Sequence, residues 1–68
     1  MNEERFNLSV RQLLKQFGIT AQREIEKSVD DALKAGRLTG SESLRATASM
    51  RVEGLEADIV VEGRITLA

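Results

Sequence analysis

Residues 17–20, Phe-Gly-Ile-Thr, decide how the N-terminal half of this chain is expected to fold. Gly18 follows an apolar position and is typical of the left-handed residue that ends a helix. Thr20 belongs to the residue types that cap the start of a helix. This stretch therefore predicts a helix over about 3–17, a very short connection, and a second helix over about 21–35.

Each of these helices carries one apolar face, because apolar residues recur three and four positions apart. On the first helix they are Phe6, Val10, Leu13, Leu14 and Phe17, and the inward face of the second is Ala21, Ile25, Ser28, Val29, Ala32 and Leu33. We expect Asn2 to cap the first helix, Gly36 to end the second, and Asp30 to pair with Lys34 one turn later. Two helices joined so tightly fold back on each other, so the prediction is an αα-hairpin.

After the polar loop 36–43 the apolar residues follow a period of two, which is typical of half-buried strands. The alternation covers about 44–67 and is interrupted at Glu53-Gly54. We interpret this dipeptide as the two-residue turn of a β-hairpin. The predicted fold class is therefore α+β, with the αα-hairpin packed on a C-terminal antiparallel β-hairpin in the order α-α-β-β.

The register of the hairpin follows from that turn. With Val52 opposite Leu55, the numbers of paired residues sum to 107. A sum of 109 is disfavoured because it places Arg45 opposite Arg64, and like charges directly across two strands destabilise a sheet. The 107 register instead pairs opposite charges on the outer face, Arg51 with Glu56 and Arg45 with Glu62.

Composition limits both size and setting. The chain has 68 residues, of which 41% are hydrophobic and 31% charged, which suits a single small domain over residues 1–68. Ten basic and eleven acidic residues give a net charge of −1, and no segment forms a basic patch. The longest apolar runs have two or three residues, too short for a signal peptide or a membrane helix. We therefore expect a cytoplasmic protein with no membrane partner.

The residues for most catalytic chemistry are missing. There is no His and no Cys, so neither an imidazole nor a thiolate is available as a catalyst or metal ligand. Ser28 could meet Lys27 or Lys34, but a serine that packs between helices fits its position better. Residues 36–41 contain two glycines, yet they lack the preceding strand, the following helix and the lysine of a phosphate-binding loop. We predict no enzymatic activity, no catalytic residue, no cofactor and no metal.

Nucleic-acid binding is the alternative function. Residues 14–20 resemble the turn of a helix-turn-helix protein, with a glycine, an aliphatic residue and a threonine that opens the next helix. The pattern then fails at Glu24, where an apolar residue usually packs the second helix on the first. That second helix also has a net charge of −1, whereas affinity for DNA comes mainly from neutralising phosphates. A capped helix pair is the favoured interpretation, and nucleic acid is disfavoured as a partner.

Several segments resemble a known family. They are the opening Met-Asn-Glu at 1–3, Phe6-Asn7, Ser9 and Arg11, the central Gly-Ile-Thr-Ala-Gln-Arg-Glu-Ile-Glu at 18–26 and the late Val-Glu-Gly at 61–63. Together they are similar to a family of small bacterial proteins of about this length, known only as a domain of unknown function. The resemblance implies a bacterial, stand-alone protein. It implies no activity, ligand or site residue.

The second strand is the predicted interaction surface. A two-stranded hairpin leaves unpaired N–H and C=O groups on both outer edges. In the 107 register this strand also runs past the end of the first. Two copies could join these strands into a four-stranded sheet with two-fold symmetry, and a monomer whose C-terminal strand lies under Leu38 is the alternative. The favoured function is a non-enzymatic protein that acts through protein contacts, self-association included, at Ile59, Val60, Val61, Ile65 and Leu67.

Overall fold

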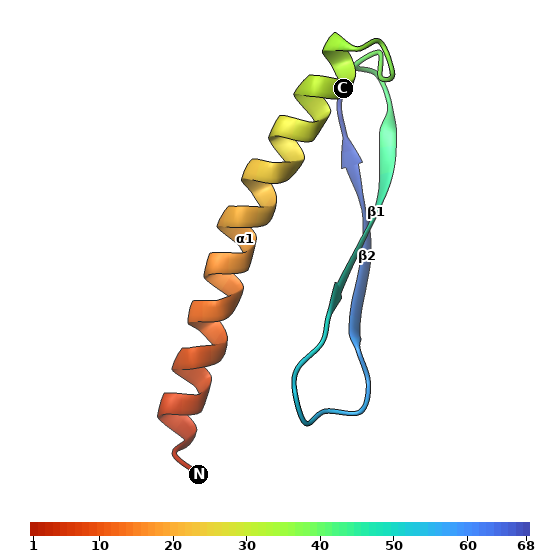
Figure 1. Cartoon of the computed structure of the whole chain (residues 1–68). Coiled ribbons are helices and arrows are strands. Elements are labelled where there is room, and N and C mark those ends of the chain that lie inside the picture. Colours follow the sequence, from red (N-terminus) through yellow and green to blue (C-terminus); the bar gives the residue numbers. More distant parts are fainter. The chain divides into compact units, whose positions relative to one another are not determined.

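The computed structural model describes all 68 residues and divides into two compact units, Met1–Arg37 and Leu38–Ala68. The first unit contains one helix, α1 (Glu3–Lys34), and the second contains the antiparallel strands β1 (Ser43–Met50) and β2 (Ile59–Thr66) (Figure 1). The class is α+β, as predicted. The αα-hairpin is wrong, because the helical part is a single helix and the order is α-β-β.

Gly18 lies inside α1 and does not end it. The glycines with positive φ are Gly36, Gly40 and Gly54, so Gly18 keeps a helical backbone. A glycine inside a helix costs about 1 kcal/mol relative to alanine, which weakens a helix without breaking it. The apolar face also continues in phase across the glycine, since Phe17 is followed by Ala21 four residues later. Residue types that often end a helix therefore fail to end this one.

The start of the helix is as predicted. The side-chain Oδ1 of Asn2 accepts a hydrogen bond of 3.0 Å from the backbone N–H of Arg5, so one of the unpaired donors of the first turn is satisfied. The expected ion pair between Asp30 and Lys34 also forms near the end of the helix, with 2.8 Å between Lys34 Nζ and Asp30 Oδ2. That hydrogen bond to the Asp30 carboxylate raises the pKa of Lys34.

The end of the helix is also as predicted. Gly36 has a φ of 77°, and its N–H donates to the carbonyl of Leu33 at 3.2 Å. The N–H of Arg37 donates to the carbonyl of Ala32 at 2.9 Å. These two bonds form a Schellman motif, which satisfies carbonyls left open by the last helical turn.

The strands pair in a register different from the one expected. Residue numbers of partners sum to 109, with Ser43 opposite Thr66 at one end, so the 107 register is wrong by two residues. Arg45 does lie opposite Arg64. A shift of two residues leaves every side chain on its predicted face. The apolar hairpin face therefore consists of Leu44, Ala46, Ala48, Met50, Ile59, Val61, Gly63 and Ile65.

The turn explains this register. The N–H of Leu55 donates to the carbonyl of Val52 at 3.1 Å, so residues 52–55 do form a turn. Its third residue, Gly54, has a φ of 86°, and no residue other than glycine has a positive φ. This is the pattern of a type II turn, which splays the flanking strands, whereas type I′ continues their twist. The strands therefore pair only as far as Met50 and Ile59, which lie on either side of the unpaired loop 51–58.

No residue of either unit is buried. On α1, Phe6 is 49% exposed, Leu13 51% and Phe17 44%. On β2, Val61 is 62% exposed. Apolar faces of this extent generally mark sites where another surface binds.

Candidate interaction surfaces

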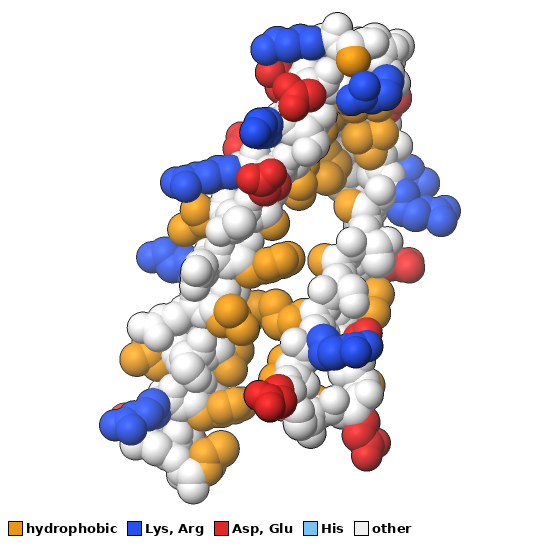
Figure 2. Space-filling model, viewed as in Figure 1, with side chains coloured by type: hydrophobic (Ala, Val, Ile, Leu, Met, Phe, Trp, Pro, Cys, Tyr) orange, Lys and Arg blue, Asp and Glu red, His pale blue; other side chains and the backbone are white.

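The first candidate surface lies along α1, and we call it the helix stripe. At 100° per residue its members fall within a sector of about 120°, the width of an apolar face that packs against a neighbour, and the same sector also contains the polar residues Glu3, Asn7, Glu24 and Asp31. Hydrophobic side chains occur along the whole length of the helix (Figure 2). Leu8, which is 54% exposed, lies on the opposite side of α1. The helix stripe consists of Phe6, Val10, Leu13, Leu14, Phe17, Ala21, Ile25, Ser28 and Ala32.

The positions of the helix stripe follow a repeat that was hidden when a helix end was predicted at Gly18. Its positions repeat every eleven residues, and the side chains become smaller toward the C-terminal end. One series is Phe6, Phe17 and Ser28, and another is Val10, Ala21 and Ala32. An eleven-residue repeat corresponds to 3.67 residues per turn, close to the 3.6 of a straight helix, so the stripe winds only slowly around it. The spacing across Gly18 was the signal that could have revealed one helix.

The second candidate surface is the apolar hairpin face, which holds most of the predicted interaction residues. Ile59, Val61 and Ile65 lie together on it, and Ile59 is 52% exposed. Leu67 follows in the same alternation just after β2. Val60, which is 56% exposed, lies on the other face. The structure thus groups four of the five predicted residues and separates the fifth.

The predicted overhang of the second strand does not exist. In the observed register Leu67 falls opposite Glu42, and its N–H donates to the Glu42 carbonyl at 2.9 Å. The C-terminal end of β2 therefore has backbone partners within its own hairpin. Unpaired C-terminal residues of β2 are therefore not available to join two copies, although the outer edges of both strands stay unpaired.

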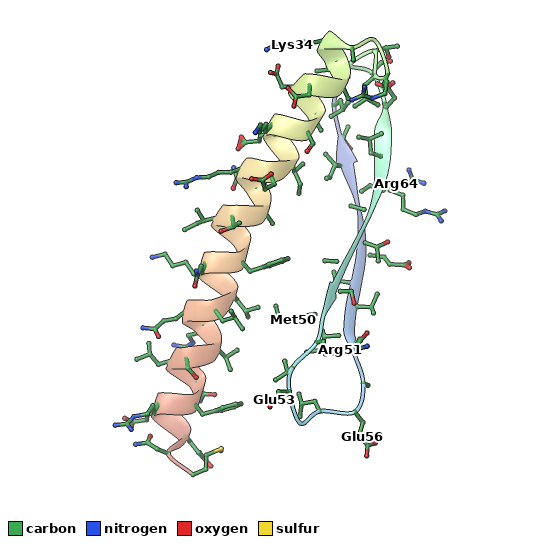
Figure 3. The ribbon with its side chains drawn as sticks, viewed as in Figure 1. Lys34, Met50, Arg51, Glu53, Glu56 and Arg64 are labelled. Carbon is green, nitrogen blue, oxygen red and sulfur yellow. The ribbon has the colours of Figure 1, made fainter.

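The loop between the strands is closed by an ion pair. Arg51 Nε lies 3.0 Å from Asp58 Oδ1, in place of the predicted contact with Glu56. Both side chains are accessible, so the pair contributes about 0.2–1 kcal/mol. Figure 3 labels Arg51 together with Glu53 and Glu56 around this loop.

A carboxylate orders the chain just before β1. Glu42 accepts backbone hydrogen bonds from Thr39, at 2.9 Å and 3.1 Å, and from Gly40 at 3.0 Å. These bonds favour the ionised form, and the one from Thr39 contributes most to lowering the pKa of Glu42. Gly40 takes a φ of 99° within this turn. The segment that the sequence indicated as a plain polar loop is therefore a specific turn.

No set of three or more His, Cys, Asp or Glu side chains in the chain is arranged to hold a metal ion. No helix combines the length with the apolar character that crossing a membrane demands.

These features define a class: a small α+β protein with one long capped helix, one hairpin, and an accessible apolar face on each. The chain belongs to a family described as "Family of unknown function (DUF6494)", whose family model matches residues 1–68. The predicted family resemblance is thereby confirmed. Comparison with curated proteins and with solved structures gave no match.

Proposed function

We propose that this chain is a non-enzymatic protein that acts by binding other protein surfaces, in the cytoplasm expected from its sequence and in a bacterium, as the family resemblance implies. The observation that carries the proposal is the helix stripe, which runs along most of a 32-residue helix in which no side chain is buried. An amphipathic helix of this kind is recognised through anchors at i, i+3, i+4 and i+7 that insert into an apolar groove or a second helix.

The same helix removes the basis of the alternative function. A helix-turn-helix protein needs a turn between its two helices, but residues 14–20 belong to the continuous α1. A nucleic-acid-binding role through that segment is therefore not supported. The accessible apolar side chains favour contacts with protein.

Affinity capture from the native host with two matched variants tests the proposal. Leu13→Glu places a charge on the helix stripe, and Leu8→Glu places the same charge on the opposite side, at a leucine of similar exposure, 54% against 51%. We expect Leu13→Glu to lose at least ten-fold of the captured protein and Leu8→Glu to retain it. Circular dichroism of both variants reports whether the helix persists.

Two results would contradict the proposal. One is equal capture by both variants. The other is capture dominated by nucleic acid, with a yield that falls steeply between low and moderate salt.

A further inference from the structure

We propose that the helix stripe binds the helix stripe of a second copy of this chain, with the two helices antiparallel. This inference rests on the proposed function and names its partner. Three features of α1 support it: the sizes of the side chains along the stripe, the charges of the two halves of the helix, and the length of the contact.

The sizes of the stripe residues are complementary when two helices run in opposite directions. In the register where paired numbers sum to 38, both phenylalanines face alanines and Leu13 faces Ile25, whereas Leu14 of the stripe falls opposite Glu24. The helices can then keep a constant separation along their length, as close packing requires. The facing pairs, each formed twice by symmetry, are Phe6 with Ala32, Val10 with Ser28, Leu13 with Ile25, and Phe17 with Ala21.

A parallel pair in register lacks this complementarity. Phe17 would face Phe17, while Ala21 would face Ala21 only one turn away, and Ala32 would face Ala32 near the end. The phenylalanines would hold the helices apart where the alanines need them close. The gaps left beside small residues cost packing energy, so the antiparallel arrangement is favoured.

Charge favours the same direction. Within α1, residues 3–18 carry three basic and two acidic side chains, a net charge of +1, and residues 19–34 carry three basic and four acidic ones, a net charge of −1. Antiparallel helices place each half against the half of opposite sign. They also set the positive end of one helix dipole beside the negative end of the other.

The contact is long enough for a specific interface. The midpoint of the proposed register, residue 19, lies within one residue of the middle of α1, so the two helices overlap along their full length. Thirty-two residues span about 48 Å, and a strip about 10 Å wide gives roughly 1,000 Å² of buried surface over both copies. That value reaches the lower limit of specific protein interfaces, so we expect a moderate affinity.

The mass of the protein in solution tests the dimer. Light scattering over a concentration series should approach twice the mass of the 7.5 kDa chain. Leu8→Glu should keep that mass, and Leu13→Glu should reduce it to one chain, because it places a charge opposite Ile25 of the second copy. A mass of one chain for the unaltered protein up to about 0.5 mM would overturn the proposal.

Engineered cysteines test the direction of the helices, since the chain has none of its own. Val10→Cys and Ser28→Cys are made as separate chains of distinguishable mass, mixed and oxidised. Antiparallel pairing should give mainly the mixed disulfide, because residue 10 faces residue 28 while two copies of residue 10 lie about 27 Å apart along the axis. Disulfides between identical chains, 10 with 10 and 28 with 28, would overturn the antiparallel arrangement.

The two proposals fail in different ways. A one-chain mass together with stripe-dependent capture of other proteins overturns the second copy as the partner and leaves the proposed function intact. A one-chain mass together with equal capture by Leu13→Glu and Leu8→Glu overturns both.

Discussion

The helix and the hairpin of this protein differ in how many of their backbone N–H and C=O groups are hydrogen-bonded. Every interior peptide group of α1 is bonded within the helix, and its ends are closed by the Asn2 cap and the Schellman motif at Gly36. The hairpin has two strands, each with one unpaired edge, and two-stranded sheets are marginally stable alone. The helix thus needs only a cover for its side chains, whereas the hairpin also has free backbone groups.

Gly18 is the position at which one substitution should disturb the continuous helix most. Gly18→Pro should lower the free energy of unfolding by about 3 kcal/mol or more, because proline removes a helical hydrogen bond and clashes with the preceding turn. Thermal melting followed by helical ellipticity measures the loss. A short connection between two helices would tolerate the proline, so a melt close to that of the unaltered protein would contradict a continuous helix.

Gly18→Ala should have the opposite sign and a smaller size. A Cβ built at Gly18 meets nothing within 4 Å, and alanine has the higher helix propensity. We expect a gain of about 1 kcal/mol and a higher melting temperature. A destabilised variant would indicate that Gly18 has a left-handed backbone in solution.

Two glycines of the hairpin, Gly54 in the turn and Gly63 in β2, form a matched pair for substitution by alanine. Gly54→Ala should cost about 1–2 kcal/mol, because Gly54 has a φ of 86° and alanine resists that conformation. Gly63→Ala should instead stabilise by about 0.5 kcal/mol or more, since Gly63 lies in β2 with a permitted φ and open space around its Cα. Chemical denaturation of both variants measures the difference, and equal stabilities would speak against the positive φ at Gly54.

Glu42 makes the start of the hairpin sensitive to pH. The pKa of its carboxyl is lower in the folded chain than the ordinary value of 4.5, so the folded state binds the proton less readily. Its contribution to stability is therefore complete above pH 4.5 and is lost as the pH falls through the folded pKa. Glu42→Gln should lower the melting temperature by a few degrees at pH 7 and leave it unchanged at a pH well below the folded pKa. A pH-independent difference would show that the Glu42 charge is not responsible.

The smallest expected effect concerns the ion pair of the loop. A double-mutant cycle of Arg51→Ala and Asp58→Ala should give a coupling of a few tenths of a kcal/mol that shrinks as salt is added. The same cycle with Glu56→Ala in place of Asp58→Ala serves as the control and should give none. Coupling to Glu56 instead would favour the 107 register.

The local signals in the sequence were reliable where one residue decides the outcome. Asn2, Gly36 and the pair of Asp30 with Lys34 all behave as their residue types and spacing predict. At Gly18 the local signal competed with an apolar face that continues over the whole helix, and the longer pattern prevailed. A glycine after an apolar residue is common at helix ends, but its presence alone does not end a helix.

The faces of the hairpin were predictable, but its register was not. Alternation fixes which side of the sheet each residue occupies, and it cannot distinguish registers that differ by two. The choice depended on the turn at Gly54, whose positive φ suits both type I′ and type II turns. In the structure Leu44 gains Ile65 as an apolar partner, while Arg45 lies opposite Arg64.

The candidate surfaces divide in the same way. Four predicted residues of the hairpin do share one face, because alternation alone places them there. The helix stripe was missed as a single surface, because dividing the helix at Gly18 split one eleven-residue repeat into two short amphipathic segments.

The short sequence separation within each unit has a kinetic consequence. A helix of this length forms in about 0.1–1 μs and a hairpin in about 1–10 μs, since neither has to close a long loop. The meeting of two copies, in contrast, takes a time set by how often they collide. If the helix stripe is covered by a second copy, refolding after dilution should therefore show a fast phase independent of protein concentration, followed by a slower phase whose rate rises in proportion to it.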